Sequence, residues 1–147
     1  MSYEERNTVA AIVVNLCVVA FFAWLIMSMY GEGAFAGDEG LAVWARTVLW
    51  VIPASVVASI VVTILFNIVF SIATQDGDPD TTVDERDRSI SIKGMRVTMI
   101  VASAGFIGAL ALLALGWSPL IGLNVILAGF ALGDLSGSVT RMALYRS

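Results

Sequence analysis

Four long apolar segments occupy most of this sequence and restrict the folds that it can adopt. A helix that crosses the roughly 30 Å hydrocarbon core of a bilayer needs about 20 mostly apolar residues. Segments of this kind run over residues 8–30, 41–74, 95–117 and 120–142. The strands of a membrane barrel would instead alternate polar and apolar positions. We therefore expect an all-α integral membrane protein, with four transmembrane helices in an antiparallel bundle that forms a single domain over residues 1–147.

The composition excludes most other classes of protein. Hydrophobic residues make up 59% of the chain and charged residues only 14%, whereas a soluble domain is about 25% charged. With no histidine and one cysteine, the chain has neither a His-based zinc or catalytic motif nor an internal disulfide. Its 12 acidic residues outnumber the 8 basic ones, which argues against nucleic acid as a partner. We expect no enzymatic activity, no cofactor and no metal.

The basic residues predict the orientation in the membrane, because lysine and arginine accumulate on the cytoplasmic side. They lie near the two termini and between the second and third segments: Arg6, Arg86, Arg88, Lys93, Arg96, Arg141 and Arg146. Only Arg46 lies on the other side. We expect both termini to be cytoplasmic, in a multi-pass protein of the cytoplasmic (inner) membrane. Trp44, Trp50 and Trp117 then fall near the outer interface, where indole rings are enriched.

The second segment, residues 41–74, is longer than one span requires, since a helix of this length measures roughly 50 Å. Either residues 41–52 lie along the outer surface and Pro53 opens the spanning helix, or one long helix continues through a kink near Pro53. We favour the single kinked helix. Residues 75–94 then form the cytoplasmic base of a hairpin, in which Asp84 caps the helix that enters the third span.

Three glycines in the fourth segment predict a close helix contact: Gly129, Gly133 and Gly137. Glycines four residues apart leave a shallow groove that a second helix can approach closely. The groove either packs against another helix of this chain or forms the seam of a homodimer, and we favour the first. The third segment offers small residues for this contact: Ala104, Gly105 and Gly108.

Asp134 lies within the apolar fourth segment, where a charge costs on the order of 2.5–3.5 kcal/mol on insertion scales. It should therefore face the bundle interior, be neutral or be paired. Ser138 and Arg141 share its helix face, and three asparagines are candidate neighbours: Asn15, Asn67 and Asn124. An intramembrane ionisable residue is a functional candidate by default, and a structural ion pair or hydrogen-bond anchor is the alternative.

Polar residues recur every four positions along the second segment: Ser55, Ser59, Thr63, Asn67, Ser71 and Gln75. This stripe winds slowly around a helix, because each step of four residues turns by about 40°. It serves either interhelical hydrogen bonding, which we favour, or one wall of a hydrated path.

Charged residues follow the second segment. The D-x-D-x-D string at residues 76–80 lacks the bidentate glutamate of an EF-hand, so we interpret it as a solvated turn. The residues after it are candidates for contact with a partner protein: Asp84, Glu85, Arg86, Asp87 and Arg88. Within this set, helical ion pairs would join Arg88 to Asp84 or Glu85.

Two isolated residues have simple structural interpretations. Arg46 is expected to act as an interfacial anchor and could pair with Asp38 or Glu39. Cys17, in the apolar first segment, is expected to be an inert thiol in the core.

The second half of the chain resembles small prokaryotic four-helix membrane proteins of unknown function. The resemblance is carried by the string Asp84-Glu85-Arg86-Asp87-Arg88-Ser89-Ile90, by Lys93-Gly94-x-Arg96, and by the closing Leu144-Tyr145-Arg146. Asn124 and Asp134 also match, since those proteins carry an asparagine near the start of the fourth helix and an acid near its inner end. The resemblance implies a four-helix membrane fold and assigns no activity.

Two functions fit these observations. The leading hypothesis is a non-catalytic accessory or interaction module that contacts a protein partner through residues 84–96. The alternative is a small transporter or channel subunit that uses Asp134 with Asn124, Asn67 and Arg141 along a polar path; a lipid- or small-ligand-binding bundle is a third, weaker option. The expected partners are the lipid bilayer and either a second copy or another protein. A cavity between Asp134 and the polar stripe of the second segment would favour the transporter.

Overall fold

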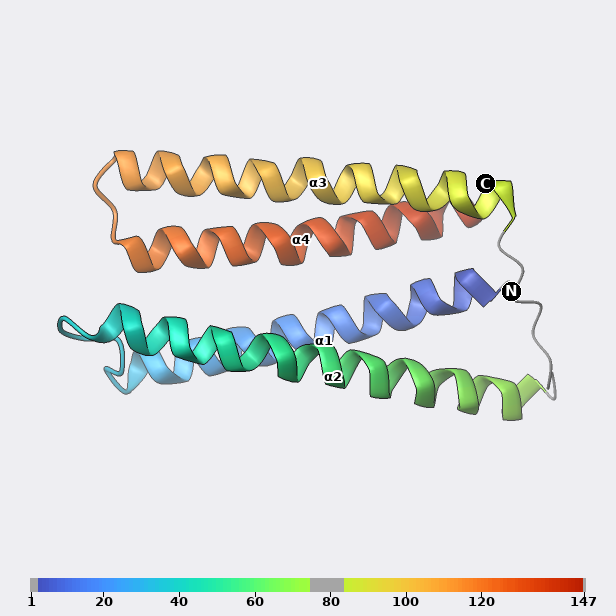
Figure 1. The fold of residues 1–147 in the computed structure, drawn as a ribbon, viewed down its shortest axis with the longest axis horizontal. Helices are drawn as coiled ribbons and strands as arrows, with labels where there is room; N and C mark the ends of the chain where they lie inside the picture. Colours follow the sequence, from blue (N-terminus) through green and yellow to red (C-terminus); the bar gives the residue numbers. More distant parts are fainter. Residues whose placement is uncertain (1–2, 75–83, 147) are drawn as a thin grey trace.

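The computed structural model describes residues 3–74 and 84–146, which form four helices. They are α1 (Tyr3–Gly31), α2 (Gly40–Thr74), α3 (Glu85–Ala114) and α4 (Pro119–Tyr145), as Figure 1 shows. Each is long and apolar enough to cross a membrane. The predicted all-α class with four candidate membrane spans is therefore confirmed at this level.

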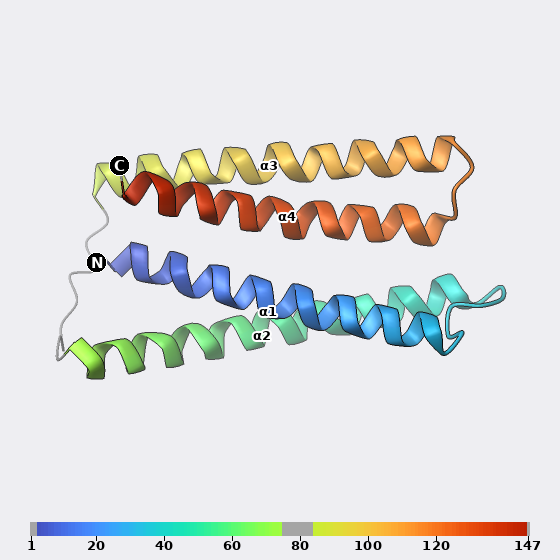
Figure 2. The same cartoon turned by 180° about the vertical axis from the view of Figure 1, so that it is seen from behind.

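The helices are arranged as two antiparallel pairs (Figures 1 and 2). α3 packs along α4, α1 lies against both α4 and α2, and α2 touches α4 over only a short stretch. The first turn of α1 and the last turn of α4 lie at the same end of the bundle, which we name the terminal end. The opposite end, with residues 32–39 and the turn after α3, is the loop end.

The helix boundaries follow local sequence signals. α2 runs unbroken from Gly40 to Thr74 with Pro53 inside it, so residues 41–52 belong to the same helix. The N-cap of α3 is confirmed: the Asp84 carboxylate accepts from the Asp87 backbone N–H at 2.7 Å, and Asp87 reciprocates. This capping box satisfies two backbone donors that the first turn leaves without helical partners.

The α3–α4 pair is held by close backbone contact along the glycines of α4. A Cβ added at Gly133 would lie 2.7 Å from the Thr98 carbonyl oxygen of α3, and one added at Gly129 would lie 2.8 Å from the Gly105 Cα. The glycine groove of α4 is thus occupied by α3 of the same chain. Of the three α3 residues expected at this contact, Gly105 is confirmed, whereas Ala104 is exposed and Gly108 has only Val125 within 4.0 Å of an added Cβ.

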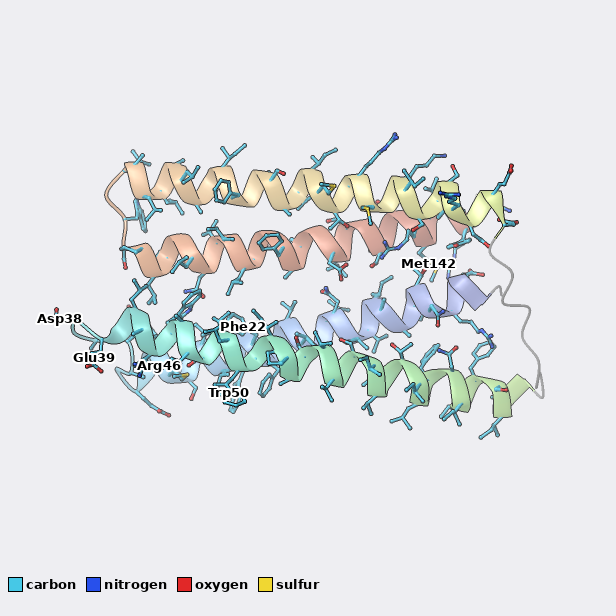
Figure 3. All side chains as sticks on the ribbon, in the orientation of Figure 1. Phe22, Asp38, Glu39, Arg46, Trp50 and Met142 are labelled. Carbon is cyan, nitrogen blue, oxygen red and sulfur yellow. The ribbon has the colours of Figure 1, made fainter. Side chains whose placement is uncertain are left out.

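Most large apolar side chains lie on the outside of the bundle, where a bilayer would solvate them. Trp50 is 79% exposed and points away from the other helices (Figure 3). Trp44 is only 5% exposed and donates to Asn124 of α4, so it lies between helices. One expectation is wrong: Cys17 is exposed on the surface of α1 rather than buried in a core.

Candidate intramembrane polar site

Asp134 is joined to α1 by a hydrogen bond between side chains. The Asn15 Nδ2 donates to the Asp134 Oδ2 at 2.8 Å. An ionised carboxylate can only accept, so this contact sets the orientation of the Asn15 amide. Asp134 itself is exposed rather than enclosed among the helices. The site is therefore built from the middle of α1 and the middle of α4.

The expected partnership of Asp134 with Ser138 and Arg141 is wrong. Arg141 Nη2 donates to the Ser138 Oγ at 2.7 Å, and Ser138 is fully buried. Among the described residues, no ion pair joins Arg141 to Asp134. The reason lies in α3: the Arg141 stem lies over Gly94, where an added Cβ would come within 2.5 Å of its Cγ. The long side chain follows that gap toward α3, whereas Asp134 faces α1.

Part of the polar stripe of α2, namely Ser55, Ser59 and Thr63, faces Asp134 across open space. A cavity of about 290 Å³ lies between α1, α2 and α4, and the polar residues lining it are Asn15, Ser55, Ser59, Thr63 and Asp134. The Ser55 hydroxyl donates to the Ile52 carbonyl and the Ser59 hydroxyl to the Ser55 carbonyl, both at 2.7 Å. The Ser55 and Ser59 hydroxyl protons are thus hydrogen-bonded to the helix backbone. Their oxygens remain available as hydrogen-bond acceptors in the cavity.

The other expected members of a polar path lie elsewhere. Asn67 is at the terminal end, where its Nδ2 donates to the Asn7 Oδ1 at 3.0 Å and to the Thr63 carbonyl at 2.9 Å. Asn124 is toward the loop end, where its Oδ1 accepts from the Trp44 Nε1 at 3.2 Å. Neither reaches Asp134. The polar residues thus form separate contacts at three levels of the bundle.

Two residues of α1 that contact α2 were not identified from the sequence. Asn7 completes the pair with Asn67, and Arg6 lies 4.7 Å from the centre of the Phe70 ring while being only 3% exposed. A guanidinium over an aromatic face is a favourable arrangement. Both residues directly precede the first apolar segment, and this proximity is the signal that could have identified them as inter-helix contacts.

The side-chain Oδ1 of Asn15 is buried and accepts no hydrogen bond from the described part of the chain. An unsatisfied buried acceptor costs about 1–3 kcal/mol. The amide is held in this orientation because its nitrogen is bound to Asp134. The pair therefore places a carboxylate and an unsatisfied oxygen together, midway along α1 and α4.

A larger apolar chamber adjoins this cavity. It measures about 590 Å³ and is lined by α1, α2 and α4, with Phe22 among its walls. Asn15, Val18, Ser55 and Asp134 line both spaces, so the chamber and the cavity lie side by side along these residues. Apart from them, Asn124 is the only polar residue among its lining residues.

The first turns of α3 carry the candidate partner surface. A shallow hollow of about 410 Å³ lies on one exposed face, lined by Glu85, Arg88, Ser89, Ile92, Lys93 and Arg96. Asp84 and Asp87 are engaged in the cap, and Arg86 is exposed. The expected ion pairs of Arg88 with Asp84 or Glu85 are absent from the described part of α3.

Two other predictions concern charged residues outside the bundle. Asp38, Glu39 and Arg46 lie at the loop end (Figure 3), but no ion pair joins them within the described residues, so that expected contact is wrong. The D-x-D-x-D string at residues 76–80 lies outside the described residues. Within residues 3–74 and 84–146, no three His, Cys, Asp or Glu side chains lie close enough together to hold a metal ion.

Comparison with protein-family models, with curated proteins and with solved structures gave no match, so the resemblance to prokaryotic four-helix membrane proteins stays a prediction from motifs.

Proposed function

We propose that this chain is a non-catalytic, multi-pass protein of a prokaryotic cytoplasmic membrane, and that it acts as a small transporter or channel subunit with a cation site at Asp134. The observation that supports this proposal is the cavity of about 290 Å³ between the Asp134 carboxylate and the hydroxyl row of α2. A solidly packed contact at this position would have favoured a structural role.

The Asp134 carboxylate is costly at a position within an apolar helix. A charged group in the hydrocarbon region is expensive, and proteins retain one where it pairs with another group or lines a polar pathway. One amide N–H from Asn15 is the only hydrogen bond to Asp134 within the described residues. A bound cation would compensate its charge directly.

Flux measurements test this proposal. Purified protein in liposomes would be given gradients of H⁺, Na⁺, K⁺ and methylammonium in turn. Asp134→Asn keeps the shape and hydrogen-bonding capacity of the side chain and removes its charge. We expect wild-type protein to pass at least one of these cations and the variant to lose that flux by about tenfold or more, because the site loses its counter-charge.

The matched control is Asp38→Asn, which makes the same chemical change in the loop after α1, where Asp38 is exposed. This variant should keep wild-type flux. Melting temperatures of all three proteins separate a lost site from a lost fold. Wild-type protein that passes none of the four cations, or equal flux in Asp134→Asn, would contradict the proposal.

The second candidate function is an interaction module, favoured by the hollow of about 410 Å³ on the first turns of α3. Arg88, Lys93 and Arg96 give this surface a positive balance over Glu85, which would suit an acidic protein segment. Arg88→Glu with Lys93→Glu should then abolish capture of an endogenous partner by crosslinking in membranes, while leaving cation flux unchanged. Identical crosslinks from both proteins would exclude this surface.

A further inference from the structure

The Asp134 cavity is polar, the chamber beside it is apolar, and Asp134 lines both. We infer that the two spaces together take an amphiphilic organic ammonium ion, with the charged nitrogen at Asp134 and the apolar body in the chamber. The inference rests on the proposed function, because it specifies the ligand class of the same site.

The charge of the lining selects a cation. Asp134 is the only ionisable residue among the residues that line the two spaces, and no lysine or arginine is among them. The Ser55 and Ser59 hydroxyl protons are engaged by backbone carbonyls, so their oxygens are left as acceptors. A primary ammonium group has three donors and no acceptor. It therefore complements a carboxylate that faces the Ser55 and Ser59 hydroxyl oxygens, whereas an anion would be repelled by the Asp134 carboxylate.

The size and apolar lining of the chamber suit a ligand with an apolar body. Its volume of about 590 Å³ lies within the roughly 300–1,000 Å³ that is typical of small-molecule sites, which combine apolar walls with a few polar groups. Phe22, Met27 and Phe130 are among its walls. An inorganic ion would use only the polar cavity. A ligand with an alkyl or aryl body would use both spaces, because Asn15, Ser55 and Asp134 line the cavity and the chamber alike.

The arrangement of the helices provides access for such a ligand. α2 touches α4 over only a short stretch, so the chamber between these helices is not closed by their packing. An amphiphilic amine concentrates in the bilayer with its apolar body among the lipid chains. It can therefore reach Asp134, which is exposed on this side of α4, directly from the membrane.

Calorimetric titration of the protein in nanodiscs, with empty nanodiscs subtracted, tests the inference. The probes are 4-phenylbutylammonium, methylammonium as the head group alone, and 4-phenylbutanoate as an anion with a similar body. We expect 4-phenylbutylammonium to bind at least about tenfold more tightly than methylammonium, since burial of the body adds affinity. The anion should give no signal above empty nanodiscs. Asp134→Asn should weaken both ammonium ions by about tenfold or more.

A second variant separates the chamber from the cation site. Ala131→Phe places a ring in the chamber and should weaken 4-phenylbutylammonium about tenfold while methylammonium changes less than about twofold. Ala111→Phe, the same substitution at an exposed position of α3 outside the chamber, is the matched control and should bind as the wild type does. Should Ala131→Phe fail to fold, Ala23→Phe fills the chamber from α1 and has the same expected result.

The outcomes distinguish this inference from the proposed function. Equal wild-type affinity for the two ammonium ions, or unchanged 4-phenylbutylammonium binding in the chamber variants, would overturn the amphiphilic ligand and leave the cation site standing. Ammonium binding that is absent, or that is the same in Asp134→Asn as in the wild type, would overturn both.

Discussion

Replacement of Gly133 by alanine tests the contact that holds α3 against α4. A Cβ at this position would lie 2.7 Å from the Thr98 carbonyl oxygen and 3.3 Å from the Ala102 nitrogen. Both atoms belong to the α3 backbone, so no side-chain rotation relieves the clash. The two helices would have to separate by roughly half an ångström over the close stretch, with loss of dispersion contacts along it.

The size of the effect follows from two opposing terms. Alanine in place of glycine within a helix stabilises it by up to about 1 kcal/mol. Overpacking of a close contact costs about 1–3 kcal/mol. Gly108→Ala is the matched control, because its added Cβ would meet only the Val125 Cγ1, at an ordinary 4.0 Å. We expect Gly133→Ala to be less stable than Gly108→Ala by about 1–3 kcal/mol.

Thermal unfolding in detergent, followed by tryptophan fluorescence, measures the difference between these variants. At about 2–4 °C per kcal/mol for a chain of this size, Gly133→Ala should melt several degrees below Gly108→Ala. Size-exclusion chromatography with light scattering should give the same oligomeric state for both. Equal melting temperatures, or a changed oligomeric state in Gly133→Ala alone, would refute the assignment of this groove to packing within the chain.

Two further contacts and the predicted orientation give measurable expectations. Trp44→Phe and Asn124→Leu, combined in a double-mutant cycle of unfolding, should show a coupling of about 0.6 kcal/mol and no more than about 1.7; zero coupling would contradict a hydrogen bond between the two side chains. Asp84→Ala should lose about 1 kcal/mol of stability with the α3 cap, whereas Asp84→Asn should retain most of it, and equal stability of both with the wild type would refute the cap. In a background without the native cysteine, an impermeant thiol reagent on intact cells should label Gly37→Cys and not Ser89→Cys; the reverse pattern would overturn the predicted orientation.

Local sequence signals were sufficient to predict the features that depend on a single helix. Apolar length alone predicts four helices that can span a membrane, because the bilayer sets a minimum of about 20 residues. The Asp84 cap is equally local, since its partner Asp87 is three residues away. The glycine spacing of α4 likewise predicts that some helix approaches closely at Gly129, Gly133 and Gly137, whatever that helix is.

The tertiary structure alone decided which residues meet. Asp134 and Arg141 are seven residues apart and start on one helix face, yet Arg141 extends over Gly94 of α3 and Asp134 binds Asn15, 119 positions away in the sequence. The placement of Trp44 between helices depends in the same way on Asn124 of α4. Helical periodicity fixes the angle at which a side chain leaves its own helix. It carries no information about the rotation, register or identity of the helix opposite, which are set by how four helices pack together.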